Sequence, residues 1–264
     1  MRVLGADASC NDLIALGEDL ETLASTGFRV APLADVVEAL ERGDYAEFAS
    51  NVACLTCDDG SNFDAQDLVH PAWGPQRSIL TTLTAFEASH AGLRAHATSF
   101  VIASPRARQI LDRTCMVGQG WWSDDWWAPA LASGCMHIAS HSWDHNHDSL
   151  PPGEQHGRTA GTFLTVDDAG LADLEIRQAN EFLREHAPNP GNALFAYPYG
   201  EASDYLASEY LPRFGNSLGL RAAFTTEPAP LTRYSPRWRM PRYVRGRDWS
   251  SRGGLERILR EARA

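Results

Sequence analysis

The sequence predicts an α/β fold, a distorted TIM-like (β/α) barrel of about seven strands, with one domain covering residues 1–264. Helical and strand-like patterns alternate along most of the chain, and no break in composition, internal repeat or low-complexity linker divides them. With 264 residues and 44% hydrophobic composition, the chain can bury one barrel-sized core. No glycine-rich phosphate-binding loop follows any expected strand, which disfavours an open, doubly wound nucleotide-binding sheet.

Hydrophobic periodicity and flanking turn residues define the expected elements. Extended segments are expected at 51–56, 97–103, 135–139, 192–197, 220–225 and 239–244. Helices are expected at 33–40, 79–86, 104–112, 123–132, 165–186, 203–214 and from about 250 onward. Ser104 is a good N-cap with Pro105 in the first turn, and Ser123 can cap the next helix. Thr165, with Asp168 three residues later, resembles a capping box.

Composition disfavours nucleic-acid and membrane partners. The 23 basic and 34 acidic residues give a net charge of -11, which repels phosphate backbones and anionic lipid surfaces. Neither a signal-peptide-like apolar stretch nor a membrane span is present in the sequence. Five cysteines, an odd number, cannot form a complete disulfide framework. We therefore expect a cytoplasmic protein, although a chain trimmed of its leader would read identically, and the oligomeric state is left open.

Polar clusters with complementary chemistry follow three of the expected strands. They are DDG at 58–60, HSWDH at 141–145 and YPYG at 197–200. In a (β/α) barrel, the carboxyl ends of the parallel strands meet on one rim, which is where the chemistry of such barrels takes place. We therefore expect these three clusters to lie close together.

The first two clusters have the residue types of a metal site. Asp58 and Asp59 are neighbours on an extended chain and point in different directions, so one can hold a metal while the other handles a proton. His141 and His145, four residues apart, face the same side of a helix-like turn. Two imidazoles and one carboxylate form a three-ligand zinc set with positions left for water and substrate. Such a histidine pair alone is more often a surface or capping feature, but its combination with DDG favours a metal site.

These segments resemble the polysaccharide deacetylase family, the NodB-homology carbohydrate esterases. That family shows TFDDG, then HSxxH or HTxxH, then a PYG-containing motif, and this sequence has TCDDG, HSWDH and AYPYG in the same order. HATSFVIAS, before the histidine motif, also resembles the family's ATFFV strand. The resemblance covers roughly residues 27–245 and implies a NodB-type barrel with hydrolase activity.

The resemblance also implies a role for each motif residue. Asp58 would be the catalytic base, and Asp59, His141 and His145 would bind a divalent metal, with Zn²⁺ expected. Such an ion polarises an amide or ester carbonyl and acidifies a water, whose proton Asp58 would accept. The backbone N–H of Tyr199 would then stabilise the oxyanion.

Two features of the family pattern are missing. The third motif lacks the arginine that orients the base, and Arg242 or Arg239 would have to replace it. Residues 187–264 contain no histidine to protonate the leaving group. His147 and His70 are the nearest candidates along the sequence, and the alternative is a water on the metal or the protonated form of Asp58.

Aromatic residues point to a saccharide substrate. The chain has eight tryptophans, and flat indole rings suit the apolar faces of sugars. Trp143 lies inside the histidine motif, and Tyr197 and Pro198 precede the oxyanion position, so these three are the expected substrate contacts. The helical spacing of Trp122 and Trp126 instead favours a place in the core.

We therefore predict a metal-dependent hydrolase of carbohydrate metabolism that removes acetyl groups from an N- or O-acetylated saccharide. The alternatives are a cytosolic amidohydrolase of the same fold acting on a small non-sugar amide, and a barrel that binds saccharide without turning it over.

Overall fold

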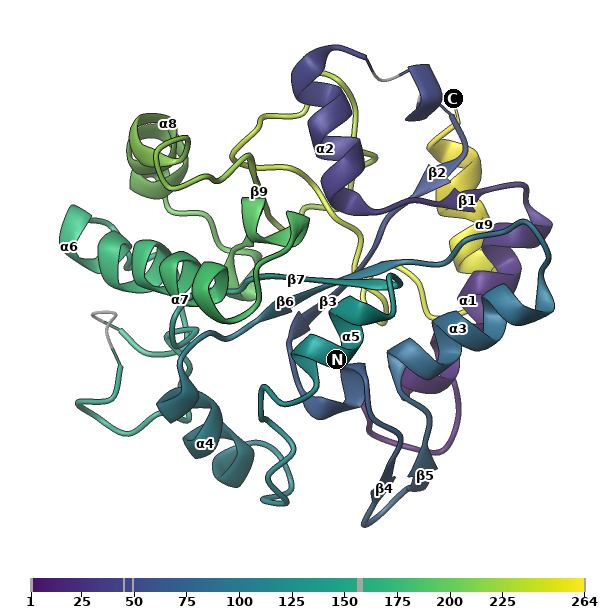
Figure 1. Ribbon diagram of the computed structural model, residues 1–264, viewed down its shortest axis with the longest axis horizontal. Coiled ribbons are helices and arrows are strands. Elements are labelled where there is room, and N and C mark those ends of the chain that lie inside the picture. The colour runs from purple at the N-terminus through teal and green to yellow at the C-terminus, as the bar shows by residue number, and fades with distance from the viewer. Residues whose placement is uncertain (1, 45, 49, 156–158, 264) are drawn as a thin grey trace.

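A five-stranded parallel sheet forms the centre of the molecule in the computed structural model, which describes residues 2–44, 46–48, 50–155 and 159–263 (Figure 1). Its strand order is β3-β6-β7-β8-β9, and every neighbouring pair is parallel. The strands are β3 (Leu55–Asp59), β6 (Ala97–Val101), β7 (Met136–Ser140), β8 (Leu194–Ala196) and β9 (Ala222–Phe224). The predicted α/β fold is confirmed, as an open half-barrel in which five strands form the main sheet of the described chain, compared with the expected seven.

Two smaller sheets flank the main sheet. β1 (Arg29–Val30) pairs in parallel with β2 (Val52–Ala53), which leads directly into β3. β4 (Leu68–His70) and β5 (Gly74–Gln76) form an antiparallel hairpin. The prediction of a strand at 239–244 is wrong. This segment forms an isolated bridge between Met240 and Phe224 of β9 and no regular ladder. Pro241 has no N–H to donate, so a regular ladder cannot continue through it.

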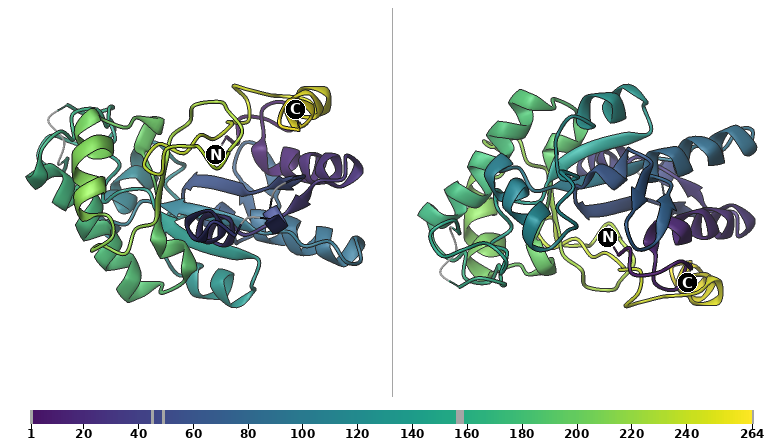
Figure 2. Two further views of the ribbon diagram at one scale, coloured as in Figure 1. Left: turned by 90° about the horizontal axis from the view of Figure 1, so that it is seen from above. Right: turned by 90° about the horizontal axis from the view of Figure 1, so that it is seen from below.

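Helices α1, α3 and α9 lie toward one end of the molecule and α6, α7 and α8 toward the opposite end (Figures 1 and 2). Buried residues of α7 nevertheless belong to the same core cluster as those of α1, α3 and α9. The α-helices are α1 (Asp12–Ser25), α2 (Leu33–Arg42), α3 (Ile79–Ser89), α4 (Pro105–Thr114), α5 (Trp127–Ala132), α6 (Ala169–Ala172), α7 (Gln178–His186), α8 (Leu211–Phe214) and α9 (Arg252–Glu261). Short 3-10 turns are η1 (Ala46–Phe48), η2 (Asn62–Asp64), η4 (Pro190–Ala193) and η5 (Pro198–Gly200), and π-helical turns are η3 (Asp173–Arg177) and η6 (Leu206–Tyr210). None of the helices in the described ranges has the length and apolar character needed to cross a membrane.

The helix caps show where local sequence signals succeed and fail. Ser104 caps α4 by accepting a hydrogen bond from the Ala107 N–H, as predicted. Ser123 does not cap α5, which begins at Trp127, because Ser123 instead donates its backbone N–H to the Asn62 side chain at 2.8 Å. Asp168, and not Thr165, is the N-cap of α6. The sequence interpretation also missed α1 altogether, although Asn11 caps it.

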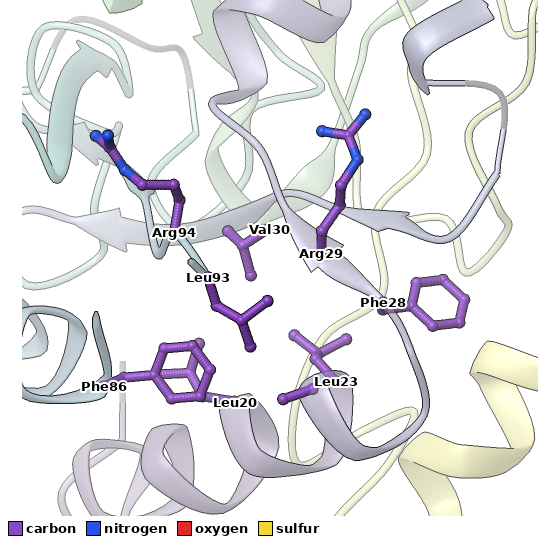
Figure 3. A pocket seen from close by; sticks show the side chains of 9 residues that line it. Leu20, Leu23, Phe28, Arg29, Val30, Phe86, Leu93 and Arg94 are labelled. Carbon is purple, nitrogen blue, oxygen red and sulfur yellow. The ribbon is translucent and has the colours of Figure 1, made fainter. Parts of the chain in front are cut away.

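The core is closely packed around the tryptophans that were predicted to be buried. Trp122 and Trp126 are 8% and 1% exposed, which confirms their predicted place in the core. Between α1, β1 and the end of α3 lies a small apolar pocket, lined by Leu20, Phe28 and other side chains (Figure 3). Its volume of about 10 Å³ holds at most one water, so we regard it as a packing gap and not as a ligand site.

Two imidazoles meet at the amino-terminal ends of β6 and β7. The ring centroids of His96 and His137 are 4.3 Å apart, and His96 is 5% exposed. Neither ring nitrogen of His96 has a hydrogen-bond partner in the described part of the chain. Burial lowers the pKa of His96 to about 3, and His137 and Arg94 act in the same direction. Burial also lowers the pKa of His137, against the opposing charge of Asp35.

Acid is therefore expected to destabilise the fold through His96. The unfolded chain takes up a proton near pH 6.5 and the folded chain only near the lowered pKa, so stability falls as pH drops below about 6.5. At pH 5 the loss is about 2 kcal/mol, or on the order of 5 °C in melting temperature. The His96→Leu protein should lose less stability between pH 7 and pH 5 in thermal unfolding. Exposed His186→Gln is the control, and an equal loss in both variants would contradict this assignment.

Candidate metal centre and catalytic carboxylate

Three residues far apart in the sequence meet at the carboxyl ends of β3 and β7. The Nε2 atoms of His141 and His145 each lie 3.6 Å from Oδ1 of Asp59, and the three candidate ligand atoms lie within 4.8 Å of one another. A separation of 3.6 Å is too long for a hydrogen bond. It is close to the spacing of about 3.4 Å between two ligands of a tetrahedral zinc ion. The structure thus brings the predicted ligand set together, and the donors fit a divalent cation.

A hydrogen bond holds the His141 ring in the tautomer that binds metals through Nε2. His141 Nδ1 lies 2.8 Å from the Ala196 carbonyl oxygen of β8, so it donates there and leaves the Nε2 lone pair facing Asp59. Both rings are almost completely buried. Burial, helped by the neighbouring His141, lowers the pKa of His145 to about 3, which keeps this imidazole neutral at physiological pH. Neutral imidazole is the ligand form, because protonation removes the lone pair.

The backbone around the site is strained. Positive φ angles occur at Asp59 (79°), Ser142 (71°), His145 (69°), Asn146 (47°) and Tyr199 (58°), which are five of the six such non-glycine residues in the described ranges. Each costs on the order of 1 kcal/mol and is retained only where surrounding contacts enforce it. The Ser142 hydroxyl is one such contact, since it accepts the His145 N–H at 2.9 Å. Strain concentrated on three separate motifs indicates that they form one functional site.

A steric restriction explains why the third residue of the DDG motif, Gly60, is a glycine. Gly60 has a φ of +75°, and an added Cβ would lie 2.4 Å from Cγ1 of Val101 on the adjacent strand. A side chain at this position would therefore push β3 away from β6. The preceding Asp59 is also anchored from its other side, because the Trp122 indole N–H donates to its carbonyl oxygen at 3.0 Å. That contact was not foreseen from the sequence, where Trp122 was assigned to the core alone.

Asp58 forms a two-pronged ion pair with Arg242. The guanidinium donates from two nitrogens to the two carboxylate oxygens, at 2.7 and 2.9 Å. Arg242 also donates to Thr56 Oγ1 and to the Thr225 carbonyl oxygen, and is nearly buried. Of the two arginines considered, Arg242 reaches the site, whereas Arg239 pairs with Asp204 at the surface. Although burial raises the pKa of Asp58, the charge and hydrogen bonds of Arg242 outweigh it and hold that pKa well below its usual range.

The third motif places only one of its aromatic rings at the site. Tyr199 is 39% exposed, and its ring lies 4.5 Å from that of His145. Tyr199 lies in the 3-10 turn η5 with a φ of 58°. The predicted substrate contact of Tyr197 is wrong, because its ring is fully buried and its hydroxyl donates to the Trp238 carbonyl oxygen at 2.9 Å. Pro198 is buried too, so both rings shape the turn and do not face substrate.

The two histidines considered as proton donors to the leaving group lie in different parts of the structure. His147 lies next to the site, with its ring 5.4 Å from that of His145 and its Nδ1 3.1 Å from Asp148 Oδ1. His70 instead lies in the β4-β5 hairpin, where its ring contacts Phe63. Of these two, His147 is thus the better placed to protonate a leaving group.

Trp143 packs edge-on against Phe182 of α7 at 5.7 Å, and its contact with a sugar stays a prediction.

Glu175 supports the histidine loop and was not identified from the sequence. This fully buried residue lies in the π-helical turn η3, and its Oε2 accepts the N–H groups of Trp143 and Asp144 at 3.2 and 3.3 Å. Its carbonyl oxygen accepts the Trp143 N–H at 2.9 Å. These contacts clamp the segment between the two histidines. No local pattern predicts a partner 32 residues away.

Removing this clamp is expected to weaken metal binding. Glu175→Ala removes the carboxylate that accepts from the Trp143 and Asp144 N–H groups and leaves only the backbone carbonyl of residue 175 to hold the strained loop, so we expect about 10- to 100-fold lower zinc affinity. Glu175→Gln keeps an acceptor and should be affected less. Competition with a chromophoric zinc chelator measures the affinity, with Glu181→Ala on the exposed face of α7 as the control. Equal affinity of Glu175→Ala and the unsubstituted protein would contradict the clamp.

The aspartates and histidines thus gather at the carboxyl ends of the parallel strands, which is where catalytic residues of (β/α) barrels lie. A family model described as polysaccharide deacetylase matches residues 47–221. This chain therefore belongs to the polysaccharide deacetylase family, whose members are amide or ester hydrolases. Among curated proteins, no sequence matches this chain.

Solved structures of deacetylases share the fold. The Streptococcus pyogenes deacetylase PplD in complex with acetate has a TM-score of 0.61 at 16% identity, covering 94% of this chain and 86% of PplD. IcaB from Ammonifex degensii has a TM-score of 0.59 at 17% identity, covering 100% of this chain and 94% of IcaB. The de-N-acetylase from Aggregatibacter actinomycetemcomitans has a TM-score of 0.61 at 11% identity, covering 93% and 88%. At these identities the similarity concerns the fold.

Proposed function

We propose that this protein is a metal-dependent deacetylase that hydrolyses the acetyl group of an N- or O-acetylated saccharide. The observation that carries the proposal is the convergence of Asp59, His141 and His145 beside an Asp58 that is paired with Arg242. The family membership supports acetyl hydrolysis, and the donor set supports the metal. A saccharide substrate agrees with the family.

Asp59, His141 and His145 would hold the ion, and one carboxylate with two neutral imidazoles is a set that suits zinc. A divalent ion there supplies Lewis acidity, which polarises the acyl carbonyl and acidifies a water molecule.

The protein's own groups supply the rest of the mechanism. Asp58 accepts the proton of the attacking water, and the guanidinium of Arg242 keeps this carboxylate ionised and fixed in orientation. The N–H of Tyr199, presented by a left-handed turn, stabilises the developing oxyanion. His147 is the imidazole placed to return a proton to the leaving group.

Acetate release tests this proposal. Purified protein is incubated with N-acetylated chito-oligosaccharides and with an O-acetylated oligosaccharide, before and after chelation, and after zinc is added back. We expect acetate release that stops with the chelator and returns with the metal. Hydrolysis of small non-sugar amides only would favour the amidohydrolase alternative. Saccharide binding without acetate release by zinc-loaded protein would favour a non-catalytic barrel.

A further inference from the structure

The tip of the β4-β5 hairpin exposes an apolar, uncharged surface. Its sequence over residues 68–76, LVHPAWGPQ, contains no Asp, Glu, Lys or Arg. Val69 is 68% exposed and Trp73 is 41% exposed, although Trp is usually well covered in a folded protein. In Figure 1 the hairpin projects from the body of the molecule beyond α5. The exposed face of this indole is open to a ligand.

The tip is rigid and presents Trp73 in a defined orientation. His70 Nδ1 accepts the N–H groups of Ala72 and Trp73, both at 3.2 Å, and its ring stacks on Trp73 at 6.4 Å with 21° between the planes. The buried Gln76 side chain donates to the Trp73 carbonyl oxygen at 3.0 Å and accepts from Asn11 at 2.7 Å. Because the turn is held from inside, a ligand would not have to order it on binding. Because Nδ1 of His70 is the acceptor, its ring proton lies on Nε2, where it can donate a hydrogen bond to a sugar hydroxyl group.

Ring contacts and one hydrogen bond connect the hairpin to the segment that carries Asp59. The Trp122 indole donates to the carbonyl oxygen of Asp59, one of the candidate ligands. The neighbouring ring of Trp121 meets Phe63 edge-on at 5.3 Å. Phe63 in turn lies 6.5 Å from the ring of His70. The hairpin is thus built onto the same segment that carries Asp58 and Asp59, and not onto a remote part of the fold.

We propose that the hairpin tip is a distal saccharide-binding subsite, in which Trp73 stacks on a sugar ring of a polymeric substrate several units away from the acetyl group being removed. This inference rests on the proposed function. A flat ring beside a free N–H donor suits the apolar face and hydroxyls of a sugar. The net charge of -11 disfavours the alternative of an anionic membrane surface. The expected substrate is therefore a saccharide oligomer or polymer, and the protein should bind it more tightly as the length of the saccharide increases.

The test compares substrates of different length. KM is measured for acetylated chito-oligosaccharides of two and six units, and for p-nitrophenyl acetate, with unsubstituted protein and the Trp73→Ala variant. We expect Trp73→Ala to raise KM for the hexamer about five- to tenfold more than for the dimer or the small ester. Tyr234→Ala is the matched control, because Tyr234 is an aromatic residue that is 77% exposed elsewhere on the surface.

Binding without turnover separates this inference from the proposed function. Calorimetry with hexamer is performed on Asp58→Asn protein with and without Trp73→Ala, and the second substitution should weaken affinity about five- to tenfold. If the unsubstituted protein releases no acetate, the proposed function fails, whatever the hexamer affinity. If Trp73→Ala and Tyr234→Ala bind hexamer equally well, the subsite is overturned. It is also overturned if Trp73→Ala changes only vesicle binding or self-association.

Discussion

Replacing Asp58 by asparagine is expected to lower kcat for acetate release by about 10²- to 10⁴-fold. The amide keeps nearly the same shape and can still accept a hydrogen bond from Arg242, but it cannot take up the proton of the attacking water. Asp58 is not one of the three candidate ligands, so metal content should stay the same. Steady-state kinetics on metal-loaded protein measures the loss, and elemental analysis of the same samples confirms that the ion is retained.

The matched control for this experiment is Asp204→Asn. Asp204 is also an aspartate paired with an arginine, Arg239, but its side chain is 99% exposed. It should leave kcat unchanged. If Asp58→Asn retains more than about a tenth of the activity, another group serves as the base, and the role assigned to Asp58 is wrong.

Arg242→Met should have the second largest effect, a loss of about 100-fold in kcat. The variant removes both hydrogen bonds that orient Asp58 and the charge that keeps it ionised. A carboxylate displaced by about 1 Å can lose on the order of 100-fold in rate. Arg242→Lys restores the charge but not the planar fork, so its activity should lie between that of Arg242→Met and the unsubstituted protein.

Arg239→Met provides the comparison, because Arg239 is the neighbouring arginine that does not reach the site. Its activity should equal that of the unsubstituted protein. Should Arg239→Met and Arg242→Met reduce kcat equally, the effect would belong to the packing of the C-terminal segment. The ion pair with Asp58 would then not be required for catalysis.

The sequence was sufficient to predict those site residues that directly follow strands of the parallel sheet. Asp59 and His141 are 82 positions apart, yet both follow apolar strands of one parallel sheet, whose carboxyl ends meet by geometry. His145 follows by its spacing from His141. The left-handed conformation of Tyr199 is likewise suggested by its Pro-Tyr-Gly context. In each case a local rule and the sheet topology point to the same arrangement.

Long-range pairings could not be predicted in this way. Arg242 and Arg239 are three residues apart in one extended segment, and only the tertiary path decides that Arg242 meets Asp58 across 184 positions. The same holds for Glu175, whose helix must be docked before its carboxylate can meet the histidine loop. Tyr197 was misassigned because motif membership does not reveal which way a strand residue faces.

The strand count was overestimated for a related reason. Residues 239–244 are apolar enough for a strand, but Pro241 interrupts the ladder, and the segment runs beside β9 with a single bridge. Ser123 was assigned to a helix cap because serine is a common cap, whereas its contact with Asn62 comes from a distant loop. Local propensity describes what a residue can do, and tertiary contacts select among those options.

The most direct test of the account is the metal content of purified protein after incubation with zinc and removal of free ions. We predict one divalent ion per chain in the unsubstituted protein and in Asp58→Asn, and a large loss in His141→Ala. Circular dichroism shows whether the variants keep their fold. An unsubstituted protein that retains no ion, or a folded His141→Ala that retains zinc as tightly as the unsubstituted protein, would contradict a metal centre at Asp59, His141 and His145.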